Sequence, residues 1–142
     1  MYNLSKTGDS VQMLITGVDI IEIDRIRRVS EKYGYRFHNR IYTEMEIAYC
    51  KGRAPQMASR FAAKEAAMKA LGTGTRGIGW KDIEIKRQRG MAPYIELHGR
   101  AARRANQIGL TDLTLSLSHS DDFAVATVVG NSDKPNQTPR NP

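Results

Sequence analysis

Two acidic side chains lie in sequence settings where a carboxylate is unusual. Asp19 interrupts the apolar run 17–21, and Glu65 lies in an alanine-rich stretch that also contains Lys69. A carboxylate in such a setting is costly to bury unless something pairs with it. No Cys or His flanks either acid, and oxygen ligands alone suit Mg2+, which substrate phosphates usually complete. The pair predicts a magnesium site, although each acid alone also fits an ordinary capping or ion-paired residue.

Basic and glycine residues follow the second acid closely. Phe61, Glu65 and Lys69 recur at intervals of four, so a helix places them on one face. Of Lys64 and Lys69, one could bind a phosphate while the other protonates a leaving oxygen, although lysine is also common on helix surfaces. A metal ion held between two acids, with bases nearby, is suited to phosphate chemistry.

Two further segments are candidates for binding an anion. The glycine-rich loop 72–77, which contains Gly72 and Gly74, could present backbone N–H groups to a phosphate, or could simply connect a helix to a strand. It follows a helix, so it is not a Walker A loop and gains nothing from the positive end of that helix's dipole. His119 lies between serines in a predicted turn, where it could bind phosphate, transfer a proton or serve as an ordinary turn residue.

Composition limits the classes of protein that fit. The chain has 142 residues, 40% of them hydrophobic, and a formal net charge of +7. This length suits one domain. The charge predicts anionic partners without choosing among nucleic acid, a phosphorylated small molecule, an acidic protein and a membrane surface. Cys50 is the single cysteine, so an internal disulfide is impossible, and its helical setting predicts a packing role.

Targeting signals are not evident in the sequence. No apolar run is long enough to span a bilayer, and the polar residues 1–10 lack the apolar core of a secretory signal. A cytoplasmic protein that does not bind membranes is therefore the expectation. Residues 1–10 and 131–142 are expected to be a disordered arm and a disordered tail around one domain at 11–130.

Hydrophobic periodicity and helix-capping signals predict an α+β fold, with an antiparallel sheet packed against one long helix and shorter helices. Thr43 and Glu46 form a capping box, Asp24 is the expected N-cap of the first helix, and Gly34 is its expected end. The expected strands are 12–21, 80–87, 94–98, 113–117 and 123–129, and the expected helices are 24–33, 44–51, 55–71 and 100–107.

Taken together and in order, these motifs resemble one family. The matching segments are Gly17-Val18-Asp19 with Arg25, Arg60-Phe61-Ala62-Ala63-Lys64-Glu65-Ala66 with Lys69 and Gly72-Thr73-Gly74, and Ser118-His119 with Ala124-Val125-Ala126. This pattern is similar to that of the holo-acyl-carrier-protein synthases, the small 4′-phosphopantetheinyl transferases. The resemblance covers about residues 14–129, and no motif position is substituted. A short segment, 50–55, departs from the pattern.

The resemblance implies a reaction in which coenzyme A donates its phosphopantetheine arm to a serine of an apo acyl carrier protein and adenosine 3′,5′-bisphosphate leaves. It implies that Asp19 and Glu65 hold Mg2+ and that Lys69 stabilises or protonates the leaving phosphate. Which group takes the serine proton, Glu65 or a water on the metal, stays open. It also implies a homotrimer with each site between adjacent subunits.

The same resemblance assigns the remaining candidates to the nucleotide. Arg60, Lys64 and His119 would help hold its phosphates, and the loop containing Gly72 and Gly74 would lie near it. Carrier proteins are acidic, so Arg25 on the first helix is the leading candidate for docking the partner.

Two other functions compete with the transferase. A basic nucleic-acid-binding module would explain the charge and the cluster Arg100, Arg103 and Arg104, but gives no reason for Asp19 or Glu65. Aromatic residues are only 7% and scattered, so they predict no base-stacking platform. A non-catalytic relative that keeps only the fold is the third possibility.

Overall fold

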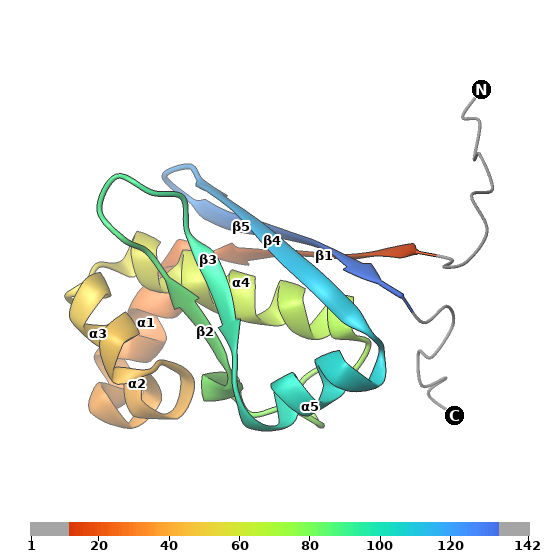
Figure 1. Cartoon of the computed structure of the whole chain (residues 1–142). Helices are drawn as coiled ribbons and strands as arrows, with labels where there is room; N and C mark the ends of the chain where they lie inside the picture. Colours follow the sequence, from red (N-terminus) through yellow and green to blue (C-terminus); the bar gives the residue numbers. More distant parts are fainter. Residues whose placement is uncertain (1–11, 134–142) are drawn as a thin grey trace.

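A three-stranded antiparallel sheet forms one layer of the molecule. The computed structural model describes residues 12–133. The sheet has the order β1-β5-β4, built from β1 (Met13–Glu22), β5 (Phe123–Ser132) and β4 (Leu110–His119) (Figure 1). Along β1, Gly17 and Ile21 are buried and the residues between them are less so, which gives the sheet an inner and an outer face.

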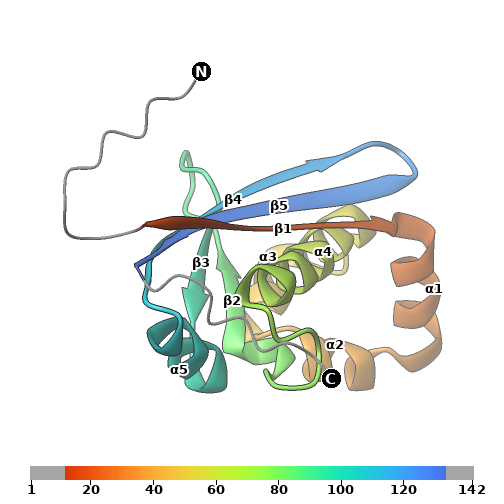
Figure 2. The ribbon, with the colours of Figure 1, turned by 90° about the vertical axis from the view of Figure 1, so that its right-hand side faces the viewer.

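The long helix α4 (Ala54–Leu71) lies against the inner face of this sheet (Figure 2). Its close approach depends on small residues. Six of its alanines are buried, Ala58, Ala62, Ala63, Ala66, Ala67 and Ala70. A Cβ atom added to Gly17 of β1 would lie 1.9 Å from the carbonyl oxygen of Ala66. Gly17 therefore lets β1 and α4 pack with their backbones almost in contact.

Smaller elements cover the other side of α4. A hairpin of β2 (Ile83–Lys86) and β3 (Tyr94–Leu97) follows the short 3-10 helix η1 (Trp80–Asp82). Helices α1 (Ile23–Tyr33), α2 (Tyr35–Ile41) and α3 (Glu44–Cys50) gather at one end, and α5 (Gly99–Gln107) lies at the other (Figure 1). The core thus lies between the sheet, α4 and these elements.

The predicted α+β class is confirmed, as are several local signals. Thr43 and Glu46 form the expected capping box, and Gly34 ends α1 with a positive φ of 52°. Cys50 is buried as expected, and burial raises the pKa of its thiol to about 11. These local features could be predicted because each depends on only a few neighbouring residues.

Other expectations about the elements were wrong. Asp24 is not the N-cap of α1, because β1 runs directly into the helix and Glu22 occupies the cap position. Helix α2 was not expected at all. Asn131 and Ser132, which were expected in the tail, belong to β5. The expected arm at 1–10 and the rest of the tail, 134–142, lie outside the described residues.

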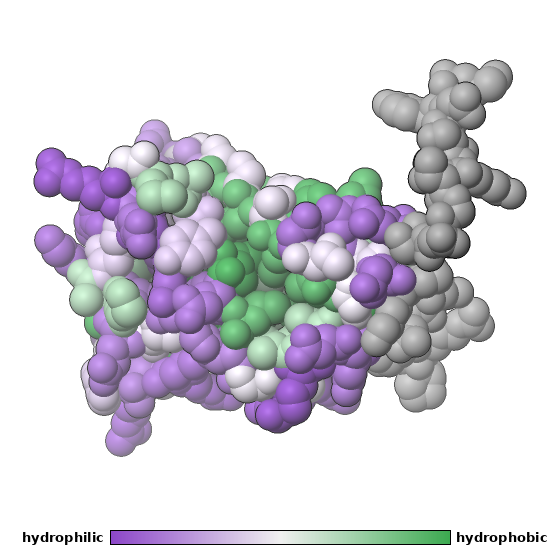
Figure 3. All heavy atoms as spheres, in the orientation of Figure 1, coloured by the Kyte–Doolittle hydropathy of each residue, from purple (hydrophilic) through white to green (hydrophobic). Residues whose placement is uncertain are grey.

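Apolar side chains remain on the surface of the sheet layer. On the outer face of β1, Leu14, Val18 and Ile20 are 68%, 56% and 64% exposed. Apolar side chains also gather between the edges of β3 and β4 on the face seen in Figure 3, where Leu113, Leu115 and Leu117 are only half-buried. Within residues 12–133, no helix combines the length and the apolar character needed to cross a membrane.

Candidate active site

The structure brings Asp19 and Glu65 together. Asp19 lies on the inner face of β1, and Glu65 lies on the side of α4 that faces this strand. The two carboxyl groups lie close enough for Asp19 to raise the pKa of Glu65, although 46 positions separate the two residues in the chain (65 minus 19). The convergence expected from the sequence is therefore present, and it is built by the close packing of α4 on β1.

Lys69 completes this group from the next turn of α4. Its Nζ donates to Asp19 Oδ1 at 3.1 Å and to the carbonyl oxygen of Val18 at 3.0 Å. The Lys69 side chain is 56% exposed, whereas that of Asp19 is 11% exposed. Glu65 and Lys69 thus flank Asp19, and the ammonium group stays accessible from solvent.

The group of Asp19, Glu65 and Lys69 contains two acidic side chains and one basic side chain. Burial, and after it the nearby Asp19 carboxyl group, raise the pKa of Glu65 to about 7 against the opposing charges of Lys69 and Arg25. A proton shared between two adjacent carboxyl groups is the usual result when like charges crowd one site. A divalent cation would relieve the same repulsion. The oxygen-only donor set and the crowded negative charge therefore fit Mg2+.

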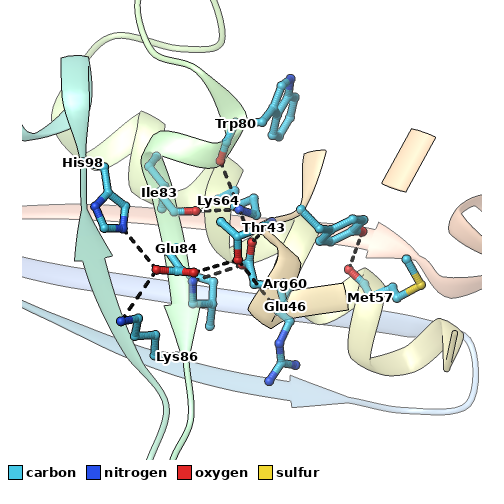
Figure 4. A network of polar contacts seen from close by, with 12 residues as sticks. Thr43, Glu46, Met57, Arg60, Lys64, Trp80, Ile83, Glu84, Lys86 and His98 are labelled. Atoms are coloured by element: carbon cyan, nitrogen blue, oxygen red, sulfur yellow. Dashed lines mark hydrogen bonds and ion pairs between the residues drawn. The ribbon is translucent and has the colours of Figure 1, made fainter. Parts of the chain in front are cut away.

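The position of Lys64 contradicts the expectation that this residue binds a nucleotide phosphate. Its side chain is completely buried, and its Nζ donates to Glu46 Oε1 at 2.8 Å and to the carbonyl oxygens of Trp80 at 3.0 Å and Ile83 at 2.5 Å (Figure 4). An ammonium group has three protons, and all three are used here. Burial lowers the pKa of Lys64 and Glu46 opposes this effect. Lys64 is therefore not placed to bind a nucleotide phosphate.

Arg60 is also interior but is less completely satisfied. It is 3% exposed, its guanidinium lies 4.1 Å from the ring centroid of Tyr49, and one terminal nitrogen reaches the carbonyl oxygen of Gln56 at 3.3 Å. Among the described residues its Nε is buried without a hydrogen-bond partner. Arg60 and Glu65 are five positions apart, or about 140° around a helix, so Arg60 faces away from the acidic pair.

The glycine loop and His119 also lie apart from Asp19. Gly72 ends α4 with a φ of 75°, and Gly74 has a φ of 58° with open space where a side chain would be. His119 ends β4 and is exposed, and its Nδ1 is 3.2 Å from the carbonyl oxygen of Ser120. Because β1 and β4 are the outer strands, about 10 Å of sheet separates His119 from Asp19.

A second group of possible metal ligands was missed by the sequence reasoning. Glu84, Glu96 and His98 on the β2–β3 hairpin place one ligand atom each within 4.8 Å of the others. Lys86 already occupies this cluster, with its Nζ 2.7 Å from Glu96 Oε2. The only available signal was Glu84, an acid between two buried isoleucines. Its burial is explained by hydrogen bonds from Thr43 and His98.

Comparison with known proteins identifies the family of this chain. Residues 15–128 match the model of the 4′-phosphopantetheinyl transferase superfamily. The chain is 48% identical over 125 residues to the holo-[acyl-carrier-protein] synthase of Herpetosiphon aurantiacus, covering 83% of this chain and 98% of that protein. It is 47% identical over 121 residues to that of Koribacter versatilis, covering 82% and 97%.

Solved structures give the same result. The holo-[acyl-carrier-protein] synthase of Helicobacter pylori in complex with coenzyme A superposes with a TM-score of 0.75 at 32% identity, covering 82% of this chain and 99% of that chain. The enzyme of Bacillus anthracis in complex with coenzyme A superposes with a TM-score of 0.70 at 35% identity, covering 86% and 99%. Motifs, fold and relatives therefore agree that this chain belongs to the 4′-phosphopantetheinyl transferase superfamily, in its group of holo-[acyl-carrier-protein] synthases.

Proposed function

We propose that this protein transfers the 4′-phosphopantetheine group of coenzyme A to a serine of an apo acyl carrier protein, with Mg2+, and releases adenosine 3′,5′-bisphosphate. The observation that carries the proposal is the close approach of the Asp19 and Glu65 carboxyl groups, with Lys69 Nζ hydrogen-bonded to Asp19. The coenzyme A complexes of the Helicobacter pylori and Bacillus anthracis enzymes support the choice of donor. The cytoplasm is the proposed location.

Each candidate residue has its own role in phosphoryl transfer. This reaction depends on positioning of the reacting groups and on neutralisation of charge. The serine hydroxyl gives its proton to Glu65 or to a water, its oxygen bonds to the phosphorus that carries the pantetheine arm, and the bond from that phosphorus to the bridging oxygen of the pyrophosphate breaks. Lys69 donates to the leaving oxygen. Asp19 and Glu65 would hold Mg2+, which neutralises charge on the pyrophosphate when bound. His119 and the loop containing Gly72 and Gly74 are proposed to contact the nucleotide, whereas Arg60, at 3% exposure, is not placed to do so.

A mass measurement tests this function. Incubation of an apo carrier protein with coenzyme A, Mg2+ and this protein should raise the intact mass of the carrier by one phosphopantetheine group. A carrier in which the acceptor serine is replaced by alanine should keep its mass. Unchanged masses for several carriers would remove the proposed function and would leave the alternative of a non-catalytic relative.

The carrier is proposed to dock near Arg25. This residue lies on α1, is exposed, and is close enough to Glu65 to lower its pKa. An acidic carrier that binds there would bring its serine beside the acidic pair.

Replacing Arg25 with glutamate should raise the KM for the carrier about tenfold and weaken the salt dependence of that KM, with the KM for coenzyme A unchanged. An unaltered KM for the carrier would place docking elsewhere. A nucleic acid is not favoured as partner, because the acidic pair would repel it.

The protein is proposed to act as a homotrimer with sites between subunits. Two observations support this. The exposed His119 does not meet Asp19 within one chain, and the apolar side chains Leu14, Val18 and Ile20 on the outer face of β1 are exposed to solvent. Within the single chain, a pocket of about 390 Å³ lies between α1 and the start of α4. None of the candidate site residues lines this pocket, so it is not the proposed site. Light scattering should give the mass of three chains, and a monomer mass at working concentration would contradict the shared site.

A further inference from the structure

The buried ion pair of Glu46 and Lys64 belongs to a hydrogen-bond network that joins more than two elements of the fold. Lys64 of α4 donates to Glu46 of α3, to the carbonyl oxygen of Trp80 in η1 and to that of Ile83 in β2 (Figure 4). Three acceptors from three separate elements fix the position of one ammonium group. The side chain of Lys64 therefore holds α4 at one defined height and rotation relative to η1 and β2.

Glu46 is itself fixed from both sides. Its Oε1 accepts from the backbone N–H of Thr43 at 2.8 Å, as part of the capping box of α3. Its Oε2 accepts from the backbone N–H of Ile85 at 3.1 Å. The hydroxyl of Thr43 donates to Glu84 at 2.7 Å, which ties the same helix end to β2 a second time. Glu46 is therefore a rigid anchor and not a mobile counter-ion.

Helix α4 approaches the backbone of β1 closely at Gly17, and the contacts of Lys64 fix the helix from its other side. Its packing surface toward the sheet consists largely of alanine methyl groups, which are small and similar from one turn to the next. A buried ion pair seldom adds much net stability, because desolvation of both charges offsets their attraction. Its best-attested use is to specify one arrangement among similar ones.

The acidic pair depends directly on this arrangement. Glu65 follows Lys64 immediately, so the two side chains leave the helix about 100° apart. With Lys64 held against β2, Glu65 must point toward β1 and Asp19. A rotation or slide of α4 would separate the two carboxyl groups and would pull Lys69 away from the carbonyl oxygen of Val18.

We infer that Glu46 is a positioning residue for the transfer reaction, and that its buried contact with Lys64 sets the orientation of α4 that joins Glu65 to Asp19. This inference rests on the proposed function, since it gives a purpose to the geometry of that same site. It also gives Lys64 a role within the matched motif that requires no contact with coenzyme A.

The test uses the full-length protein and two variants, Lys64→Met and Glu46→Gln. Lys64→Met removes the charge and the three hydrogen bonds at similar volume. Glu46→Gln keeps the volume but cannot accept from both backbone N–H groups and from Lys64 at once. The matched control is Tyr42→Phe. It removes another buried hydrogen bond to α4, from Tyr42 to the carbonyl oxygen of Met57 at 2.8 Å, about two turns from Glu65.

Two quantities are measured well below the melting temperature of each variant. These are the dissociation constant for Mn2+, followed by its electron paramagnetic resonance signal, and the kcat and KM of transfer followed by carrier mass. We expect both variants to weaken Mn2+ binding at least about tenfold. We also expect kcat to fall about 100-fold, with the KM for the carrier within about twofold of the original. Tyr42→Phe should lose stability without changing either quantity.

The outcomes distinguish failure of this inference from failure of the proposed function. Wild-type levels of Mn2+ binding and kcat in Glu46→Gln would overturn the inference while leaving the proposed function intact. If Lys64→Met does not fold, Glu46→Gln decides alone. If neither variant folds, the pair serves folding and not positioning, and the inference is also overturned. If the unaltered protein neither binds Mn2+ nor modifies a carrier, the proposed function itself has failed.

Discussion

Replacing Glu65 with glutamine is expected to abolish transfer and, at the same time, to stabilise the metal-free protein above pH 7. The pKa of Glu65 is about 7 in the folded protein, against an ordinary value of 4.5, because burial and then Asp19 disfavour its charge. Below pH 4.5 the carboxyl group is protonated in both the folded and the unfolded chain. As the pH rises through 7, the folded protein must ionise it, and this contribution to stability is lost.

Glutamine stays neutral and avoids that loss. Because Glu65 is partly exposed, solvent screening reduces the gain, and we expect about 1 kcal/mol at pH 8 and none at pH 4. Calorimetric melting at both pH values, with EDTA present, measures the difference. Glu31→Gln, at an exposed position of α1, is the control and should show no such pH-dependent gain. Transfer should fall at least 1000-fold in Glu65→Gln. A less stable variant at pH 8 would show that the acidic pair is not strained as described.

The largest effect on stability is expected for Gly17→Ala. The added methyl carbon would lie 1.9 Å from the carbonyl oxygen of Ala66 and 2.9 Å from the nitrogen of Ala70. Both are backbone atoms of α4 that cannot rotate away, so β1 and α4 must separate. Overpacking of this kind costs about 3 kcal/mol, and here the backbone contact makes a larger loss the expectation. Urea unfolding should show a much lower midpoint or no folded protein.

Gly77→Ala is the matched control for this substitution. The nearest atom to its added methyl carbon is 3.8 Å away, which is an ordinary contact, so the midpoint should change little. If Gly17→Ala unfolded at the same urea concentration as the original protein, the close contact between β1 and α4 would be absent, and with it the basis for joining Asp19 to Glu65.

The sequence predicted those parts of the site that depend on regular spacing. The interval of four between Glu65 and Lys69 placed both on one face of the helix that is α4, and the expected strand around Asp19 is present as β1. The motif resemblance added that the two elements meet. Local composition could not have shown this, because contact between β1 and α4 depends on the whole path of the chain between them.

The errors about Lys64 and Glu84 had a common cause. Lys64 was assigned to phosphate from its place beside Glu65 and from the motif resemblance, yet tertiary contacts from Glu46, Trp80 and Ile83 supply it with three acceptors. Glu84 was overlooked for the same reason, since its partners Thr43 and His98 lie in other elements. Buried charged groups are recognised by their partners, and those partners are brought close only by the fold.

The location of the bound cation tests the central claim most directly. Crystals grown with Mn2+ in place of Mg2+, together with coenzyme A, would show the metal by its anomalous scattering. The account predicts a peak within about 2.2 Å of a carboxylate oxygen of both Asp19 and Glu65. A peak at Glu84, Glu96 and His98 with none at Asp19 and Glu65 would contradict it.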